Sequence, residues 1–176
     1  SRGDTTIDLG NTGNYGDTRY YSGLQIVDAA TSHNDIKLVG SAKAANTLIG
    51  GTGATSLYGG GSSRDSLVGG TGSDTFYYGD GDGRDTITGY HYDAADVTDS
   101  DKLAFLTSDV TKVTRTSDDT VKVTFGSGTN NTLTVNMDTS DTPDTAIAYS
   151  VGGKDHLAKI GRSDATANTF TYDSTV

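Results

Sequence analysis

Residues 50–77 read GGTGATSLY GGGSSRDSLV GGTGSDTFY, three successive copies of a unit that opens on glycines and closes beside a large apolar residue. The last copy, residues 69–77, matches the β-helix nonapeptide G-G-x-G-x-D-x-U-x at every fixed position, where U is large and apolar. Degenerate copies of the unit continue the repeat on both sides. The apolar residue therefore recurs at steps of nine to eleven positions, at Leu38, Leu48, Leu57, Leu67, Phe76 and Ile87.

The repeat predicts a stacked solenoid. Glycines can take the positive-φ conformations that tight turns need, and the apolar residue at U can point inward. One unit alone could not bury that residue, whereas stacked units form a continuous apolar ladder. We therefore expect residues 38–87 to fold as an array of short strands and turns.

The composition outside the repeats agrees with an all-β chain. All 23 acidic residues are aspartate, and aspartate, glycine and threonine favour turns and strands over helices. The net charge of -10, with only 13 Lys and Arg, excludes nucleic acid as an expected partner. No apolar run reaches the length of a membrane span.

Alternating segments flank the repeats and predict further strands. The expected fold is all-β: a parallel β-roll or β-solenoid followed by a β-meander cap. The solenoid covers residues 1–98, with its core at 38–87, and the cap covers residues 99–176. Strands are expected upstream at 6–9, 24–28 and 36–39, in the meander at 110–116, 120–125 and 132–137, and at the far end at 146–151, 157–160 and 169–172.

The repeats resemble the RTX (repeats-in-toxin) family of exported bacterial proteins. GDGDGRDTI at residues 79–87 looks like the final turn of an RTX array, and DSDKLAF at residues 99–105 looks like the strand that follows it. The resemblance implies two nonapeptides per coil, with calcium held between successive coils by repeat aspartates and backbone carbonyls. It would place the chain outside the cell or on the surface of a bacterium, exported by a type I secretion channel.

Calcium is the expected cofactor, at most as one or two ions. Two nonapeptides per coil would put Asn46, Asp65 and Asp85 along one edge, and Ile36, Thr55 and Asp74 along the other. Only Asp65 and Asp85 then keep two successive carboxylates, and calcium requires several oxygen ligands. The candidate metal ligands are Asp65, Asp74, Asp80, Asp82 and Asp85. The alternative is that these aspartates only cap turns.

No catalytic pattern accompanies the repeats. His33, His91 and His156 stand at no metal-ligand spacing, and no nucleophile motif is present, so we expect no enzyme activity. A deep pocket lined by His91, Asp93 and Asp96 would favour an enzyme instead.

Tyrosines cluster at the repeats and just after them, at Tyr58, Tyr77, Tyr78, Tyr90 and Tyr92. They are candidate aromatics of a sugar-binding face, or residues that brace the strands.

The sequence therefore predicts a non-catalytic C-terminal module of a larger exported bacterial protein, which supports secretion and calcium-assisted folding. Residues 168–176, NTFTYDSTV, resemble the C-terminal export signals of RTX proteins. The alternative is a carbohydrate- or surface-binding module of an extracellular enzyme or adhesin, with a polysaccharide or cell surface as partner.

Overall fold

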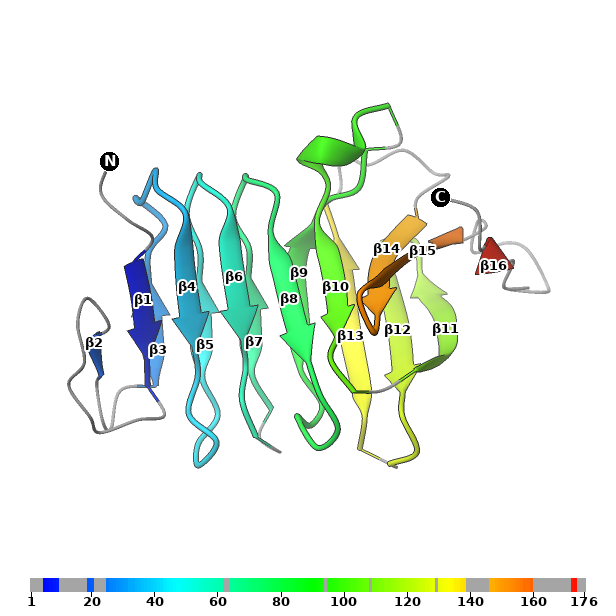
Figure 1. Ribbon diagram of the computed structural model, residues 1–176, viewed down its shortest axis with the longest axis horizontal. Coiled ribbons are helices and arrows are strands. Elements are labelled where there is room, and N and C mark those ends of the chain that lie inside the picture. Colours follow the sequence, from blue (N-terminus) through cyan, green and yellow to red (C-terminus); the bar gives the residue numbers. More distant parts are fainter. Residues whose placement is uncertain are drawn as a thin grey trace.

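A computed structural model describes residues 5–9, 19–20, 25–61, 64–93, 95–107, 109–128, 130–138, 146–159 and 172–173. This part of the chain is all-β, with one short 3-10 turn at Val97–Asp99 and no α-helix. Its strands form two stacked sheets, one of nine strands and one of seven (Figure 1). No helix in the described ranges is long and apolar enough to span a membrane.

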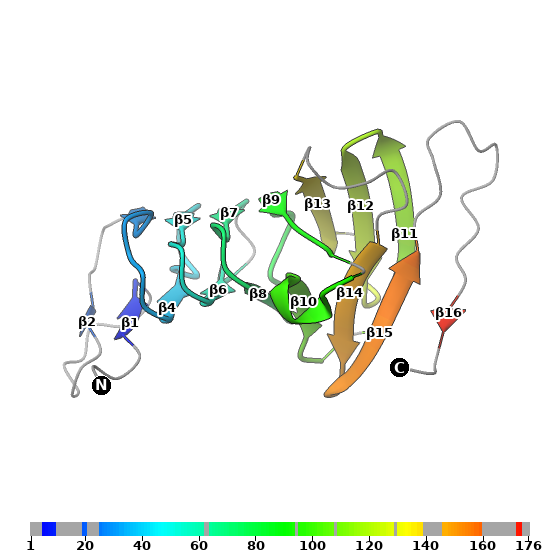
Figure 2. The ribbon, with the colours of Figure 1, turned by 90° about the horizontal axis from the view of Figure 1, so that it is seen from above.

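The repeats form the predicted parallel β-roll. Successive strands alternate between the sheets, so that each turn of the chain crosses from one layer to the other (Figure 2). The nine-stranded sheet takes β4 (Ile36–Val39), β6 (Thr55–Tyr58) and β8 (Thr75–Tyr78). The seven-stranded sheet takes β5 (Thr47–Ile49), β7 (Ser66–Val68) and β9 (Thr86–Tyr90).

Strands upstream of the repeats begin both sheets. β1 (Thr5–Asp8) pairs in parallel with β4 and with β2 (Arg19–Tyr20), and β3 (Ile26–Asp28) pairs in parallel with β5. The prediction of strands in this region is therefore confirmed, with boundaries shifted by one or two residues.

Strands downstream of the repeats extend the same two sheets. β10 (Lys102–Phe105) pairs in parallel with β8, just past the expected boundary between solenoid and cap. The expected meander is present as β11 (Val110–Ser117), β12 (Thr120–Phe125) and β13 (Thr132–Met137), and β13 pairs in parallel with β9.

The last segments join the nine-stranded sheet. β14 (Ala146–Val151) pairs in parallel with β10 and forms a hairpin with β15 (Lys154–Lys159), while β16 (Tyr172–Asp173) pairs with β15. β15 overlaps the predicted range 157–160 and begins three residues before it, and β16 overlaps the predicted range 169–172 at Tyr172. The expected export signal at 168–176 lies outside the described residues, apart from β16.

The core consists of two inward apolar ladders, as the repeat predicted. Each rung is fully buried, and burying one such side chain contributes about 1.5–3 kcal/mol. One ladder contains Leu38, Leu57, Phe76 and Leu103, and the facing ladder contains Leu48, Leu67, Ile87 and Val135. Beyond the repeats an aromatic cluster fills the space between the sheets, with ring centroids 5.1–6.4 Å apart for Tyr78, Phe105, Phe125 and Tyr149.

Candidate metal centre

The repeat turns end on inward-facing polar residues, which lie at the two long edges between the sheets. Along one edge stand Asn46, Asp65 and Asp85, and along the other stand Thr55, Asp74 and Asp101. Each of these side chains is at most 2% exposed. In the D-x-U pattern the aspartate lies two residues before the apolar rung, so that both side chains point between the sheets.

Each of the four aspartates links its coil to the neighbouring one. The Asn46 N–H donates to Asp65 Oδ1 at 2.6 Å, and the Asp65 N–H donates to Asp85 Oδ1 at 2.9 Å. On the other edge the Thr55 N–H donates to Asp74 Oδ1 at 2.7 Å, and the Asp74 N–H donates to Asp101 Oδ1 at 2.8 Å. We call these four carboxylates the aspartate ladder, because each adds one rung to the hydrogen-bonded stack of turns.

The second carboxylate oxygen distinguishes the members of the aspartate ladder. Asp101 Oδ2 accepts a hydrogen bond from the His91 N–H at 2.9 Å. The Oδ2 atoms of Asp65, Asp74 and Asp85 are buried and accept no hydrogen bond from the described residues. A buried carboxylate oxygen without a donor is costly, so these three atoms call for a proton or a cation.

Two of these oxygens converge on one point. A Cβ atom added to Gly59 would lie 2.8 Å from Asp65 Oδ2 and 3.1 Å from Asp85 Oδ2. The Tyr78 hydroxyl is also buried without a hydrogen-bond partner among the described residues. Burial raises its pKa most, and the negative charges of Asp85 and Asp65 raise it further. We call Asp65 Oδ2 and Asp85 Oδ2 the convergent oxygens.

Burial raises the pKa of all four carboxyls of the aspartate ladder. It raises the pKa of Asp65 to about 6, of Asp74 and Asp101 to about 7, and of Asp85 to about 8, although backbone N–H donors oppose the shift in each case. Mutual repulsion with Asp65 and Asp82 adds to the shift at Asp85. Ionised carboxylates are therefore disfavoured here unless a positive charge lies close by.

The other two predicted metal ligands lie in the turn that follows β8. Asp82 Oδ2 accepts the Gly79 N–H at 2.6 Å, and Asp80 Oδ1 accepts a hydrogen bond from Asn131 Nδ2 at 3.3 Å. Burial raises the pKa of Asp82. In the described ranges no three Asp or His side chains converge closely enough to form a metal cluster. A calcium ion at the convergent oxygens would therefore depend on backbone carbonyls for its remaining ligands.

The sequence predicted three of the four residues of the aspartate ladder and missed Asp101. The predicted pairing of Asn46, Asp65 and Asp85 on one edge, and of Thr55 and Asp74 on the other, matches the strand register. Asp101 was not predicted as the next residue of the second edge. Its signal was present, since residues 101–103 read DKL and repeat the D-x-U pattern of residues 74–76.

The structure corrects the expected tyrosine face. Tyr78 and Tyr90 are fully buried, because both point between the sheets, so they cannot contact a ligand on the surface. Tyr58 and Tyr77 lie on the outer face of the nine-stranded sheet and stack face to face, with centroids 4.3 Å apart and planes 2° apart. Lys37 Nζ lies 4.4 Å from the centroid of the Tyr58 ring.

A cavity of about 190 Å³ lies near the 3-10 turn and the β14–β15 hairpin. Tyr92, Val97 and Leu157 are among its lining residues, and an ion pair of 2.9 Å joins Lys102 Nζ to Asp155 Oδ1 at its wall. His91, Asp93 and Asp96 do not line it, so the arrangement that would favour an enzyme is not found at this cavity.

No protein-family model matches the chain, and no curated protein matches it significantly.

Proposed function

We propose that this chain is a non-catalytic, RTX-like module of an exported bacterial protein, which completes its folding outside the cell with the help of calcium. The observation that carries the proposal is the pair of convergent oxygens, two buried carboxylate atoms from successive coils that accept no hydrogen bond from the described part of the chain. The parallel β-roll and its aspartate ladder agree with the resemblance of the sequence to that family.

The energetics of the aspartate ladder support folding that depends on calcium. Without a cation, burying the ionised carboxylates costs the free energy of removing them from water. Asp65 and Asp85 also repel each other. A bound calcium ion would reverse both costs, and its binding free energy would add to folding. The chain would then remain loosely folded where calcium is scarce and become ordered where calcium is plentiful.

Asp65 and Asp85 are the residues that would hold an ion, through the convergent oxygens. Asp74 Oδ2 is a second candidate ligand, but its neighbours on the same edge are Thr55 and Asp101, and Asp101 already uses both oxygens. The geometry therefore fits the expectation of at most one or two ions.

Calcium-dependent thermal unfolding tests the proposal. Calcium at about 100 times its dissociation constant should stabilise the wild-type chain by about 2.7 kcal/mol. For a chain of this size that corresponds to a rise in Tm of about 5–10 °C. The double variant Asp65→Asn/Asp85→Asn should lose this rise, because it removes both anionic ligands.

The matched control is Asp109→Asn/Asp119→Asn, which removes two charges from exposed positions and should keep the calcium response. The proposal fails if the wild-type Tm does not respond to calcium, or if the control loses the response as completely as the ladder variant. Export is tested separately, by asking whether a reporter fused to the chain reaches the medium only in cells with a type I channel.

Binding of neutral sugars by the tyrosines receives less support. Sugars stack on the open faces of aromatic rings, whereas Tyr58 and Tyr77 cover one face of each other and Lys37 lies over the ring of Tyr58. This geometry favours the bracing role for these two tyrosines.

A further inference from the structure

The outer face of the seven-stranded sheet has an unusual composition for so acidic a chain. Six of its seven strands, namely β5, β7, β9, β13, β12 and β11, contain no aspartate and expose mainly Thr, Ser, Lys and Arg side chains. The seventh strand, β3, lies at the far edge of the sheet and ends on the exposed Asp28. All 23 acidic residues lie outside those six strands, in a chain which as a whole has a net charge of -10. We call this surface the basic face; its members in the argument are Arg64, Arg84, Lys112, Lys122, Ser66, Thr86, Thr124 and Thr134.

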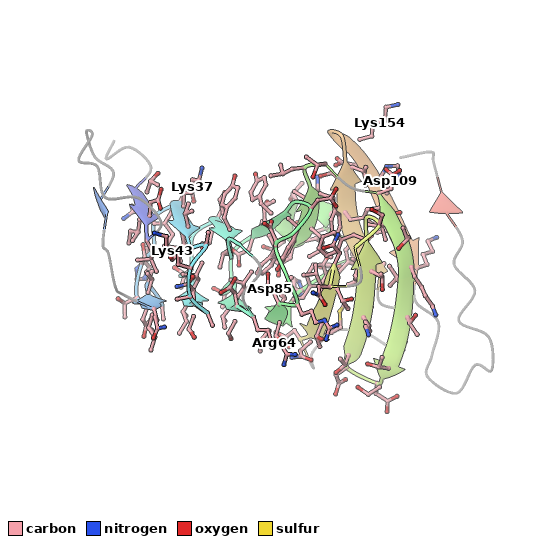
Figure 3. The ribbon with its side chains drawn as sticks, turned by 90° about the horizontal axis from the view of Figure 1, so that it is seen from below. Lys37, Lys43, Arg64, Asp85, Asp109 and Lys154 are labelled. Carbon is pink, nitrogen blue, oxygen red and sulfur yellow. The ribbon has the colours of Figure 1, made fainter. Side chains whose placement is uncertain are left out.

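Arg64 and Arg84 lie at one edge of the basic face, in the turns that lead into β7 and β9. Ser66 pairs with Thr86 in the parallel register of β7 and β9, and continuing that register two residues back places Arg64 beside Arg84. Both arginines are exposed, and both line one open hollow of about 520 Å³ together with Ser66, Thr86 and Thr134. Figure 3 shows Arg64 at the margin of the molecule, on the side away from Lys37.

This pair of arginines has no ion-pair partner in the part of the chain that the structure describes. Neither guanidinium makes an ion pair or hydrogen bond with another described residue. Asp65 is the one acidic residue that lines the hollow, but its side chain is 2% exposed and belongs to the aspartate ladder beneath. Like charges on adjacent strands, which lie about 4.8 Å apart, are destabilising unless an anion joins them.

Two lysines continue the basic face beyond the hollow. Lys122 pairs with Thr134 across β12 and β13, and Lys112 pairs with Thr124 across β11 and β12. Both lysines are exposed, while the neighbouring Val113, Val121 and Val123 point into the core. The cations and hydroxyls therefore form a continuous strip that crosses five strands from β7 to β11.

We infer that the basic face binds an acidic polysaccharide, with the carboxylate or sulfate groups held by Arg64 and Arg84. The planar guanidinium presents paired donors that suit such anions, and the Ser and Thr hydroxyls beside it can pair with sugar hydroxyls. A strip of cations across successive strands suits an extended polymer with regularly spaced charges better than a single small anion.

The side chains of the basic face also indicate which class of polyanion it can bind. Single-stranded nucleic acids need aromatic side chains on which bases stack, and these strands point no aromatic ring outward. Neutral sugars depend on the same kind of stacking, so charge must supply the attraction here. The overall negative charge of the chain opposes general binding to phosphate backbones.

Binding to hyaluronan oligosaccharides, which carry one carboxylate per disaccharide, tests the inference. Titrations would use the full chain in calcium, at about physiological ionic strength, where long-range attraction is screened beyond about 8 Å. Arg64→Gln/Arg84→Gln should weaken binding about tenfold or more, the scale of losing a charge-assisted hydrogen bond. Lys112→Gln/Lys122→Gln should weaken it to a smaller extent.

The matched control is Lys37→Gln/Lys154→Gln, which changes net charge equally but lies in β4 and β15 of the other sheet and should leave affinity unchanged. Circular dichroism of each variant in calcium shows whether the fold persists, so that a failure of calcium-assisted folding is distinguishable from a failure of binding. The inference is overturned if the wild type does not bind hyaluronan, if neutral dextran or single-stranded DNA binds equally well, or if the control loses as much affinity as the arginine variant.

Discussion

Replacing Asp74 by Asn should stabilise the protein at neutral pH when calcium is chelated. Asp74 is 1% exposed, and its Oδ1 accepts the Thr55 N–H while its Oδ2 has no donor among the described residues. Burial raises the pKa of this carboxyl to about 7. Asn has nearly the shape of a protonated aspartate and can still accept the Thr55 N–H, but it carries no charge to be buried.

The sign and size follow from the pKa difference. The unfolded chain releases the Asp74 proton near its ordinary pKa of 3.8, whereas the folded chain keeps it until about pH 7. Between these values the folded state binds more protons, so its stability is fully present at low pH and falls as pH rises through about 7. The difference corresponds to about 4 kcal/mol. Asp101, whose pKa is also raised to about 7, titrates beside Asp74 and adds in the same direction.

Urea unfolding in chelator, at a series of pH values from about 4 to about 9, measures this directly. Wild-type stability should fall across the series, while Asp74→Asn should fall less steeply and exceed the wild type above about pH 7 by as much as about 4 kcal/mol. Asp119→Asn, an exposed change, should follow the wild type. The reasoning is refuted if wild-type stability in chelator rises with pH, or if Asp74→Asn destabilises the protein equally at every pH.

Three further substitutions test the packing of the roll. Gly59→Ala should destabilise the protein by about 1.5–3 kcal/mol in urea unfolding, because the new Cβ crowds the convergent oxygens and so shifts the carboxylates of Asp65 and Asp85, whose Oδ1 atoms accept backbone N–H groups. Gly79→Ala, whose Cβ would meet its nearest atoms at 3.7 Å, should cost less, and equal losses would contradict the crowding. Leu57→Ala removes a fully buried rung and should cost about 2–5 kcal/mol, whereas Leu106→Ala, at a residue 56% exposed, should be nearly neutral; comparable losses would contradict the assigned core. Tyr78→Phe should not reduce stability in chelator, because the hydroxyl has no hydrogen-bond partner to lose; a loss above about 1 kcal/mol would indicate an additional contact.

The repeat made the solenoid predictable, because its period and the two units per coil implied by the RTX resemblance together determine which residues stack. A spacing of two units per coil places Leu57 between Leu38 and Phe76, and the same counting places Asp65 beside Asp85. These predictions needed no knowledge of the flanking strands. Counting repeats along the sequence selected Asp65 and Asp85, and the structure shows that an oxygen of each converges on the same point. Binding of calcium by these two residues stays a prediction.

Positions outside the period were harder to predict. Tyr78 aligns with Gly59 in the stack and therefore points inward. Burial there, and then the charges of Asp85 and Asp65, raise the pKa of its hydroxyl. The sequence alone presented it as one more tyrosine of a surface cluster. Asp101 follows a connection of ten residues after β9, and this break in spacing concealed its place in the aspartate ladder.

The basic face could not be read from the sequence, because its members come from two kinds of structure. Arg64 and Arg84 belong to the repeats, whereas Lys112 and Lys122 belong to an antiparallel meander that could have packed anywhere on the roll. Only the pairing of β13 with β9 places these four cations on one sheet. The repeat also explains why carboxylates are absent there: it confines aspartate to turns and leaves strand positions to Thr, Ser and apolar residues. An acidic chain built this way carries its negative charge at its edges and ends, so one broad face can attract an anion that the net charge would repel.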